Sequence, residues 1–315
     1  MRKVEILLAI LSSGCTESMA DSKQPQVALA LFEQFETVFS AKTDLFSGSK
    51  GYRNLSQQDA NTLRVPFANL IGALDSLPDH ASVGLFASAD AVLVGARDFH
   101  PPAGLGGVRS RFCYIVVLEN STFELRKYFS QPPIASARGM TIWNWQVKLG
   151  EFGENDPRPS SLYATQVEQS YVLVSNDLEE LQTIAKRLAS PGRDSPDLSG
   201  IREWASVSPN DIWGYRRYRH TGIADRIAAG MRGVTPGAEA LIFFPDFERN
   251  AGVLRLLNSP ADERTAANLN ATAKLPPFRS TGAGAWETLI PFSSGEKTLE
   301  WMIGAMGLFG FGLYL

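Results

Sequence analysis

The segment Ser170–Pro191 constrains the fold more than any other stretch of the chain. Tyr171–Val174 is a short apolar run rich in β-branched residues, which is typical of a buried strand. Apolar residues then recur at helical spacing, at Leu178, Leu181, Ile184, Ala185 and Leu188. Ser175, Asn176 and Asp177 are candidate N-caps, of which Asn176 has capping-box spacing with Glu179, and a proline–glycine pair ends the helix. The segment therefore predicts a strand that leads directly into an amphipathic helix.

Two other segments resemble this strand–turn–helix unit. Cys113–Pro132 and Ala240–Pro260 each predict an apolar strand, a polar turn, an amphipathic helix and a closing proline. The strands Ile142–Trp145 and Ile212–Tyr215 also match each other. We interpret these matches as an internal duplication with a period of about 60 to 70 residues. The alternative is that unrelated strand–helix elements look alike at this level of pattern.

Many short apolar runs predict further strands. They lie at Val83–Ala87, Ala91–Ala96, Phe112–Leu118, Met140–Leu149, Leu162–Val167, Asp211–Arg219 and Trp286–Phe292. Tight connections such as Glu168–Ser170 favour antiparallel pairing. The predicted helices stand between groups of strands instead of alternating with them. We therefore expect an α+β fold, in which an antiparallel or mixed sheet is covered by amphipathic helices and is built from repeated β-rich β-turn-α units.

An N-terminal helical hairpin is expected before these strands. Gln26–Ser40 predicts a helix, because its apolar residues form one stripe. A second helical stripe begins near Ser56 and ends at Leu77, with Pro66 as a kink. The polar, Gly/Ser-rich stretch Lys42–Asn54 connects the two helices, as in an αα-hairpin.

The domain organisation follows from one linker candidate. Ser190–Gly200 is rich in Ser, Pro, Gly and Asp, as domain linkers and long loops are. We expect an α+β unit with the helical hairpin over residues 25–190. Residues 200–315 form a second α+β unit or continue the same domain.

The N-terminus resembles a bacterial lipoprotein signal peptide. A basic start is followed by the apolar run Ile6–Leu11 and by small residues before Cys15. The resemblance implies that residues 1–14 are removed, that Cys15 is lipidated and that residues 15–24 form a tether. It places the protein in the cell envelope, periplasmic or at the outer surface, anchored to a membrane. The alternatives are cleavage after Ala20, or no cleavage and a cytoplasmic location.

Composition excludes several classes of partner and site. The formal net charge of -3 disfavours a dedicated nucleic-acid binder. Two cysteines cannot build a disulfide framework, and Cys113 lies in an apolar strand, which predicts a buried core thiol. His80, His100 and His220 have no zinc-ligand spacing with one another or with cysteine. We therefore expect no metal site and no cofactor.

The stretch from Trp213 to His220 is the strongest local anomaly in composition. On a strand, one face would carry Trp213, Tyr215, Arg217 and Arg219. Aromatic rings and guanidinium groups together suit stacking and phosphate contacts, so these residues are the candidate ligand or partner surface. The alternative is that the rings pack on the sheet while the arginines meet nearby carboxylates.

No motif for catalysis is complete. Ser293–Thr298 follows a strand and opens a helix, but Glu296 interrupts the glycine–lysine pair that a P-loop requires. No serine has the glycine-flanked nucleophile pattern. We assign no catalytic residue and expect a non-catalytic, lipid-anchored envelope protein that binds a protein or small-molecule partner. The alternative is a hydrolase-like enzyme whose site is assembled from residues far apart in the sequence.

Overall fold

The computed structural model describes residues 27–28, 30–32, 34–42, 73–74, 76–97, 111–119, 122–137, 140–147, 160–190, 212–217, 240–246, 249, 251–257, 278–282 and 285–291. Most of these residues lie in strands, and few lie in helices. Every strand pairing is antiparallel. The predicted α+β class is thus confirmed at the level of a mixed helix and antiparallel-sheet fold.

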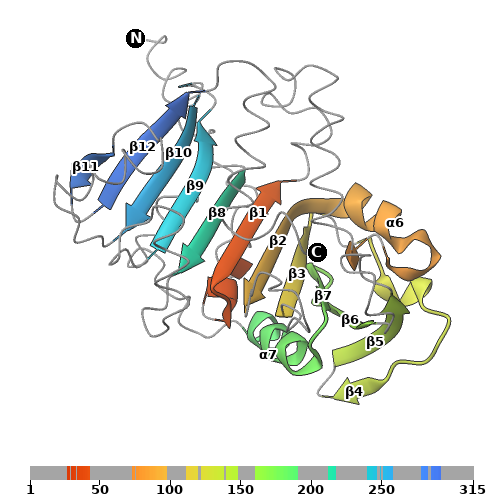
Figure 1. The fold of residues 1–315 in the computed structure, drawn as a ribbon. Coiled ribbons are helices and arrows are strands. Elements are labelled where there is room, and N and C mark those ends of the chain that lie inside the picture. Colours follow the sequence, from red (N-terminus) through yellow and green to blue (C-terminus); the bar gives the residue numbers. More distant parts are fainter. Residues whose placement is uncertain are drawn as a thin grey trace, which may run out of the picture.

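The described strands form one 12-stranded sheet with the order β11-β12-β10-β9-β8-β1-β2-β3-β7-β6-β5-β4 (Figure 1). The strands are β1 (Thr37–Lys42), β2 (Ala89–Arg97), β3 (Arg111–Leu118), β4 (Ala135–Ala137), β5 (Met140–Val147), β6 (Ser160–Val167), β7 (Tyr171–Ser175), β8 (Ile212–Arg217), β9 (Ala240–Asp246), β10 (Ala251–Leu257), β11 (Arg279–Gly282) and β12 (Ala285–Pro291). Both proposed α+β units therefore contribute strands to the same sheet.

The sheet consists of two wings that meet where β1 pairs with β8. The first wing, β1 to β7, runs outward as β1-β2-β3 and then returns from the edge as β4-β5-β6-β7. The second wing, β8 to β12, runs outward as β8-β9-β10 and returns from its edge as β11-β12. Both wings thus add their strands in the same order, with two more strands in the return path of the first.

Two apolar layers lie on opposite faces of the sheet, because successive strand residues point to opposite sides. One layer, on the α6 face, contains Phe39, Val94 and Val116 and packs with helix α6 (Ala81–Ser88). The other, on the α7 face, contains Leu93 and Ile115 among its strand residues and packs with the helical residues near position 30 and with helix α7 (Leu178–Ala189). Two short 3-10 turns complete the described elements, η1 (Pro78–His80) and η2 (Leu125–Tyr128).

Strand β7 and helix α7 form as the sequence predicts. The hairpin between β6 and β7 turns at Glu168 and Gln169, which both have positive φ, as the twist of a tight hairpin requires. The N-cap of α7 is Asp177, one of the three candidate caps in the sequence, and its Oδ1 accepts the amide of Glu180 at 3.0 Å. Asn176 is used elsewhere, because its Oδ1 accepts the amide of Phe112 at 3.0 Å.

Three predicted local structures are wrong. Thr37–Ser40, predicted as the end of the first helix, belongs to β1. The described helical residues of that segment, 27–28, 30–32 and 34, all come before it. Val83–Ala87, predicted as a strand, lies in α6. The helix expected after Phe112–Leu118 is reduced to the 3-10 turn η2. In each case the run is short, and helix and strand cannot be separated by periodicity alone at such lengths.

The three predicted repeat units are not alike in the structure. Ala240–Pro260 contains two strands, because Ala251–Leu257 is β10 and forms a hairpin with β9 instead of a helix. Within the described parts of the three segments, only Ser170–Pro191 has a strand followed by an α-helix. The N-terminal hairpin is described only in part: its second helix shows residues 73 and 74, and Ser190–Gly200 is described only at Ser190.

Gly95 of β2 shows how closely the N-terminal segment packs on the sheet. A Cβ atom at this position would overlap the ring of Phe35, which lies over it. Phe35 is 2% exposed and belongs to the apolar layer on the α7 face. The missing side chain at Gly95 therefore makes the space that the Phe35 ring fills.

Candidate functional site

The predicted surface on β8 does not expose its aromatic rings. Trp213 and Tyr215 are only 2% and 1% exposed, and both lie on the α7 face. The ring of Phe32 covers them, with centroid distances of 5.7 Å to Trp213 and 4.7 Å to Tyr215. These two side chains therefore fill the core, which was the alternative left open by the sequence.

Arg217 is the part of this predicted surface that reaches solvent. Its side chain is exposed, its Nε donates to the Tyr215 hydroxyl at 3.0 Å, and its guanidinium lies 5.9 Å from the Tyr215 ring centroid. Arg219 and Cys15 lie outside the described residues. Arg217 thus continues a buried aromatic group at the end of β8 and does not join an exposed aromatic surface.

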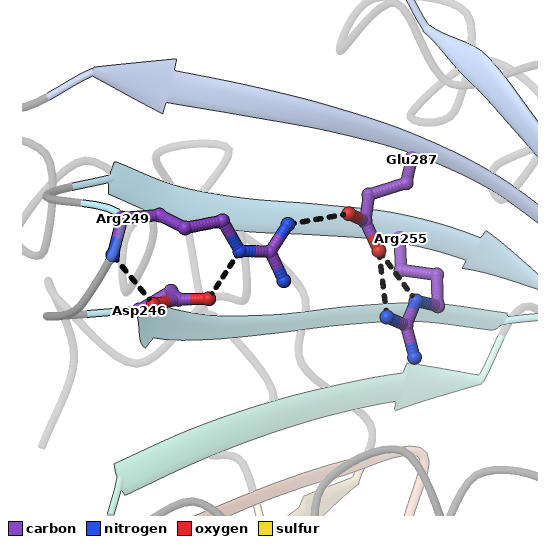
Figure 2. A network of polar contacts seen from close by, with 4 residues as sticks. All are labelled: Asp246, Arg249, Arg255 and Glu287. Carbon is purple, nitrogen blue, oxygen red and sulfur yellow. Dashed lines mark hydrogen bonds and ion pairs between the residues drawn. The ribbon is translucent and has the colours of Figure 1, made fainter.

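A charged network crosses β9, β10 and β12 in the second wing (Figure 2). Arg249 donates through Nε to Asp246 Oδ2 at 2.6 Å and lies 3.5 Å from Glu287 through NH1. Arg255 donates through Nε and NH2 to Glu287 Oε2, at 3.0 Å and 2.6 Å. The four side chains carry two positive and two negative charges, so the network is neutral as a whole.

This network is built for holding strands together. The hydrogen bond to Asp246 raises the pKa of the Arg249 guanidinium, which keeps that group charged. The Arg255 guanidinium also lies 5.5 Å from the ring centroid of Phe244, a distance that suits a cation–π contact. Ion pairs of this kind tie neighbouring strands in register and leave each charge with a partner.

A second polar group lies under α7, around Cys113. The thiol is fully buried, and its Sγ lies 3.6 Å from the carbonyl oxygen of Tyr114. Burial raises the pKa of the Cys113 thiol, and the nearby Glu180, itself 4% exposed, raises it further. Since the thiolate is the reactive form, this cysteine is held in its unreactive state. The prediction of a buried core thiol is confirmed.

One group of aromatic residues lies on the α6 face at β5. Trp143 and Trp145 are two residues apart on this strand and share that face; we call the pair the aromatic platform. The ring of Phe129 stacks on Trp143, with a centroid distance of 5.5 Å and an interplanar angle of 23°. The same ring meets Trp145 edge-on at 5.8 Å. Trp145 and Phe129 are half-buried, whereas Trp143 is 8% exposed.

Hydrogen bonds hold the aromatic platform and the segment that covers it. The indole Nε1 of Trp145 donates to Ser76 Oγ at 3.1 Å. Gln166 of β6 binds the segment Phe123–Phe129, which brings the Phe129 ring over the platform, through two hydrogen bonds. Its Oε1 accepts the amide of Leu125 and its Nε2 donates to the carbonyl of Phe123, both at 2.8 Å. The sequence predicts the strand of Trp143 and Trp145, but no pattern in it links that strand to Phe129 or to Ser76, which is 69 residues away from Trp145 along the chain.

The described residues were also compared with the requirements of a metal site and of a membrane-spanning helix. Among these residues, no group of three or more His, Cys, Asp or Glu side chains is placed to hold a metal ion. His80 is exposed, and His100 and His220 lie outside the described residues. No described helix combines the length and apolar character that crossing a bilayer requires.

Comparisons with known proteins give only distant structural likeness. No protein-family model matches the chain, and no curated protein matches its sequence. Crystal form I of TP0453 is similar to this chain with a TM-score of 0.44 and 10% identity, over 87% of this chain and 94% of that chain. Crystal form III of TP0453 has a TM-score of 0.43 and 10% identity, over 85% and 94% of the two chains. Likeness at this level carries no functional conclusion.

Proposed function

We propose that the protein is an exported, lipid-anchored and non-catalytic envelope protein that binds a partner or ligand. The support for the anchor is the sequence around Cys15, which resembles a lipoprotein signal. The observation that carries the binding role is the half-buried aromatic group formed by Phe129 and the aromatic platform. Aromatic side chains supply large contact areas at little cost in conformational entropy, and they dominate many binding sites.

The described charged residues of the second-wing network and of the α7 cap favour a structural role over a catalytic one. Arg249, Arg255 and Glu287 are engaged with one another, and Asp177 caps α7. Cys113, the described thiol, has a raised pKa and is fully buried. The hydrolase alternative therefore has no specific support among the described residues, and the membrane is the partner expected through Cys15.

Metabolic labelling tests the anchor. The chain and its Cys15→Ser variant are expressed in a bacterium with a labelled fatty acid, and membranes are separated from soluble fractions. We expect the label on the unaltered chain in the membrane fraction, and a soluble, unlabelled variant. An unaltered chain that keeps an unmodified N-terminus in mass spectrometry would contradict the anchor.

The internal duplication also stays a proposal, with its boundaries moved. Its support is that both wings add strands in the same order, starting from the β1–β8 pair. The unit would then begin at β1 and again at β8, and not at the strand–helix segments. An alignment of related sequences tests this: the profile of residues 37–118 should match that of residues 212–257 better than shuffled sequences do.

A further inference from the structure

Phe129 is carried to the aromatic platform by a short exposed loop. Residues 130–133 are all exposed, and they follow directly after Phe129. The amide of Phe129 itself donates only over a long distance, 3.5 Å to the carbonyl of Arg126. The described contacts of this loop with the sheet are thus concentrated in one side chain, the Phe129 ring.

Both ends of the loop are held firmly. Before it, the ring of Tyr128 stacks on Phe123 at 5.4 Å and 15°, and Leu125 is fully buried. After it, the amide of Ile134 donates to the carbonyl of Ile142 at 2.9 Å. Residues 129–133 therefore form a loop between two held points, and none of them takes part in the β4–β5 pairing.

The aromatic platform keeps its place independently of Phe129. Both tryptophans lie on β5, which pairs with β6 along its length. The Trp145 indole is oriented by its hydrogen bond to Ser76 Oγ, and Ser76 in turn donates to the carbonyl of Ala73 at 2.7 Å. A binding surface held in this way does not need to be ordered when a ligand arrives.

We propose that Trp143 and Trp145 form a binding site for an aromatic ring of a ligand, and that Phe129 is a displaceable plug that occupies the site in the free protein. The benzyl group of Phe129 stands in for the ligand, since it makes the stacked and edge-on contacts that an incoming ring would make. The ligand is a small aromatic compound or an aromatic side chain of a peptide, because both present the same ring. This proposal rests on the proposed binding function and gives it a location.

Fluorine NMR on the full chain tests the site. The probes are para-fluorobenzyl alcohol and a capped five-residue glycine–serine peptide with a central para-fluorophenylalanine. The variants are Phe129→Ala, which removes the plug, and Phe129→Ala with Trp145→Leu, which also removes half of the aromatic platform. Ile134→Ala is the matched control, because Ile134 is an apolar side chain next to the loop and is 47% exposed.

The plug predicts a definite order of affinities. If the open loop is populated at roughly 1–10% in the free protein, Phe129→Ala should bind a probe roughly 10- to 100-fold more tightly than the unaltered chain. The affinity of Ile134→Ala for a probe should stay within about twofold of that of the unaltered chain, and the double variant should no longer bind the probe. Stronger binding of the peptide would identify a protein partner, and stronger binding of the alcohol a small molecule.

Two results would overturn the proposal. One is equal affinity of the unaltered chain and Phe129→Ala. The other is a double variant that binds as well as Phe129→Ala, which would place the probe elsewhere. Hydrogen exchange of the unaltered chain needs no variant: amides of residues 130–131 should exchange faster than those of Phe123 and Leu125, and equal protection would exclude an opening loop. Labelling at Cys15 can fail while the probe binds, so the anchor and the site are tested separately.

Discussion

Strand β3 in the first wing and strand β12 in the second differ in what covers them. All residues of β3 after Arg111 are buried, because apolar layers lie on both of its faces. In β12 only Thr288 is buried, and Glu287 belongs to the charged network. A strand buried on both faces reads as a continuous apolar run, whereas β12 mixes apolar, polar and charged residues. The comparison shows that β3 is held by packing on both faces, whereas β12 adds ion pairs to its neighbours.

The largest effect should come from overpacking the first wing. Gly95→Ala places a methyl group inside the space of the Phe35 ring, so we expect a loss of about 3 kcal/mol in the free energy of unfolding. Urea denaturation measures it. The double variant with Phe35→Leu should recover part of the loss, because the smaller side chain makes room. Equal stability of Gly95→Ala and the unaltered chain would mean that Phe35 does not lie over β2.

A smaller loss is expected from the network of the second wing. Glu287→Gln removes the charge that Arg255 binds in a half-buried position. We expect a loss of about 2 kcal/mol in the free energy of unfolding, a value between those typical of surface and of buried ion pairs. The matched change in the first wing is Glu124→Gln, whose carboxylate meets the exposed Arg126 and Lys127. We expect no measurable change there. If both variants lose the same stability, the two wings do not differ in their use of charge.

The cap of α7 should contribute less again. Asp177→Ala removes the acceptor of the Glu180 amide and should cost about 1 kcal/mol in the free energy of unfolding. Asp177→Asn keeps a good capping side chain and should lose only a small part of this. If Asn176 were the cap, as the sequence spacing suggested, Asp177→Ala would leave thermal denaturation unchanged.

The smallest effect is confined to alkaline pH. Burial and, to a smaller extent, the negative charge of Glu168 raise the pKa of Tyr171 to about 12. The pKa of Tyr171 is thus higher in the folded chain than in the unfolded chain. The folded state therefore has its full stability below pH about 10 and loses part of it as the pH rises towards 12. Ultraviolet titration of Tyr171→Phe should lose one late-titrating tyrosine. An unchanged late phase would show that Tyr171 ionises as an exposed phenol.

The elements that sequence analysis predicted well are those with unambiguous periodicity or continuous burial. Strands β3 and β7 are apolar runs bounded by polar residues, and α7 has both caps and an apolar stripe. The failures have one physical cause: in β1, α6 and β10 the apolar runs are short, and the covering layer decides between helix and strand. In β10, Val253 and Leu254 are buried on opposite faces, which local spacing cannot reveal.

The candidate site was predicted only in part for a related reason. Trp143 and Trp145 alternate on a strand, so their common face follows from the sequence. The ring that covers them comes from a loop, and Ser76 is far away along the chain. For β8, alternation placed Trp213 and Tyr215 together correctly, but their exposure depends on Phe32, which reaches them from another segment.

The β1–β8 pairing has a consequence for the order of folding. It joins Thr37 to Arg216 and Ala41 to Ile212, so the strands at the centre of the sheet are far apart along the chain. The β1–β2 and β8–β9 pairs connect neighbouring strands at lower loop-closure cost. Each wing can therefore collapse on its own before the central pair forms, and joining them becomes a slow late step. Until then, the open edges of β1 and β8 are available to other chains.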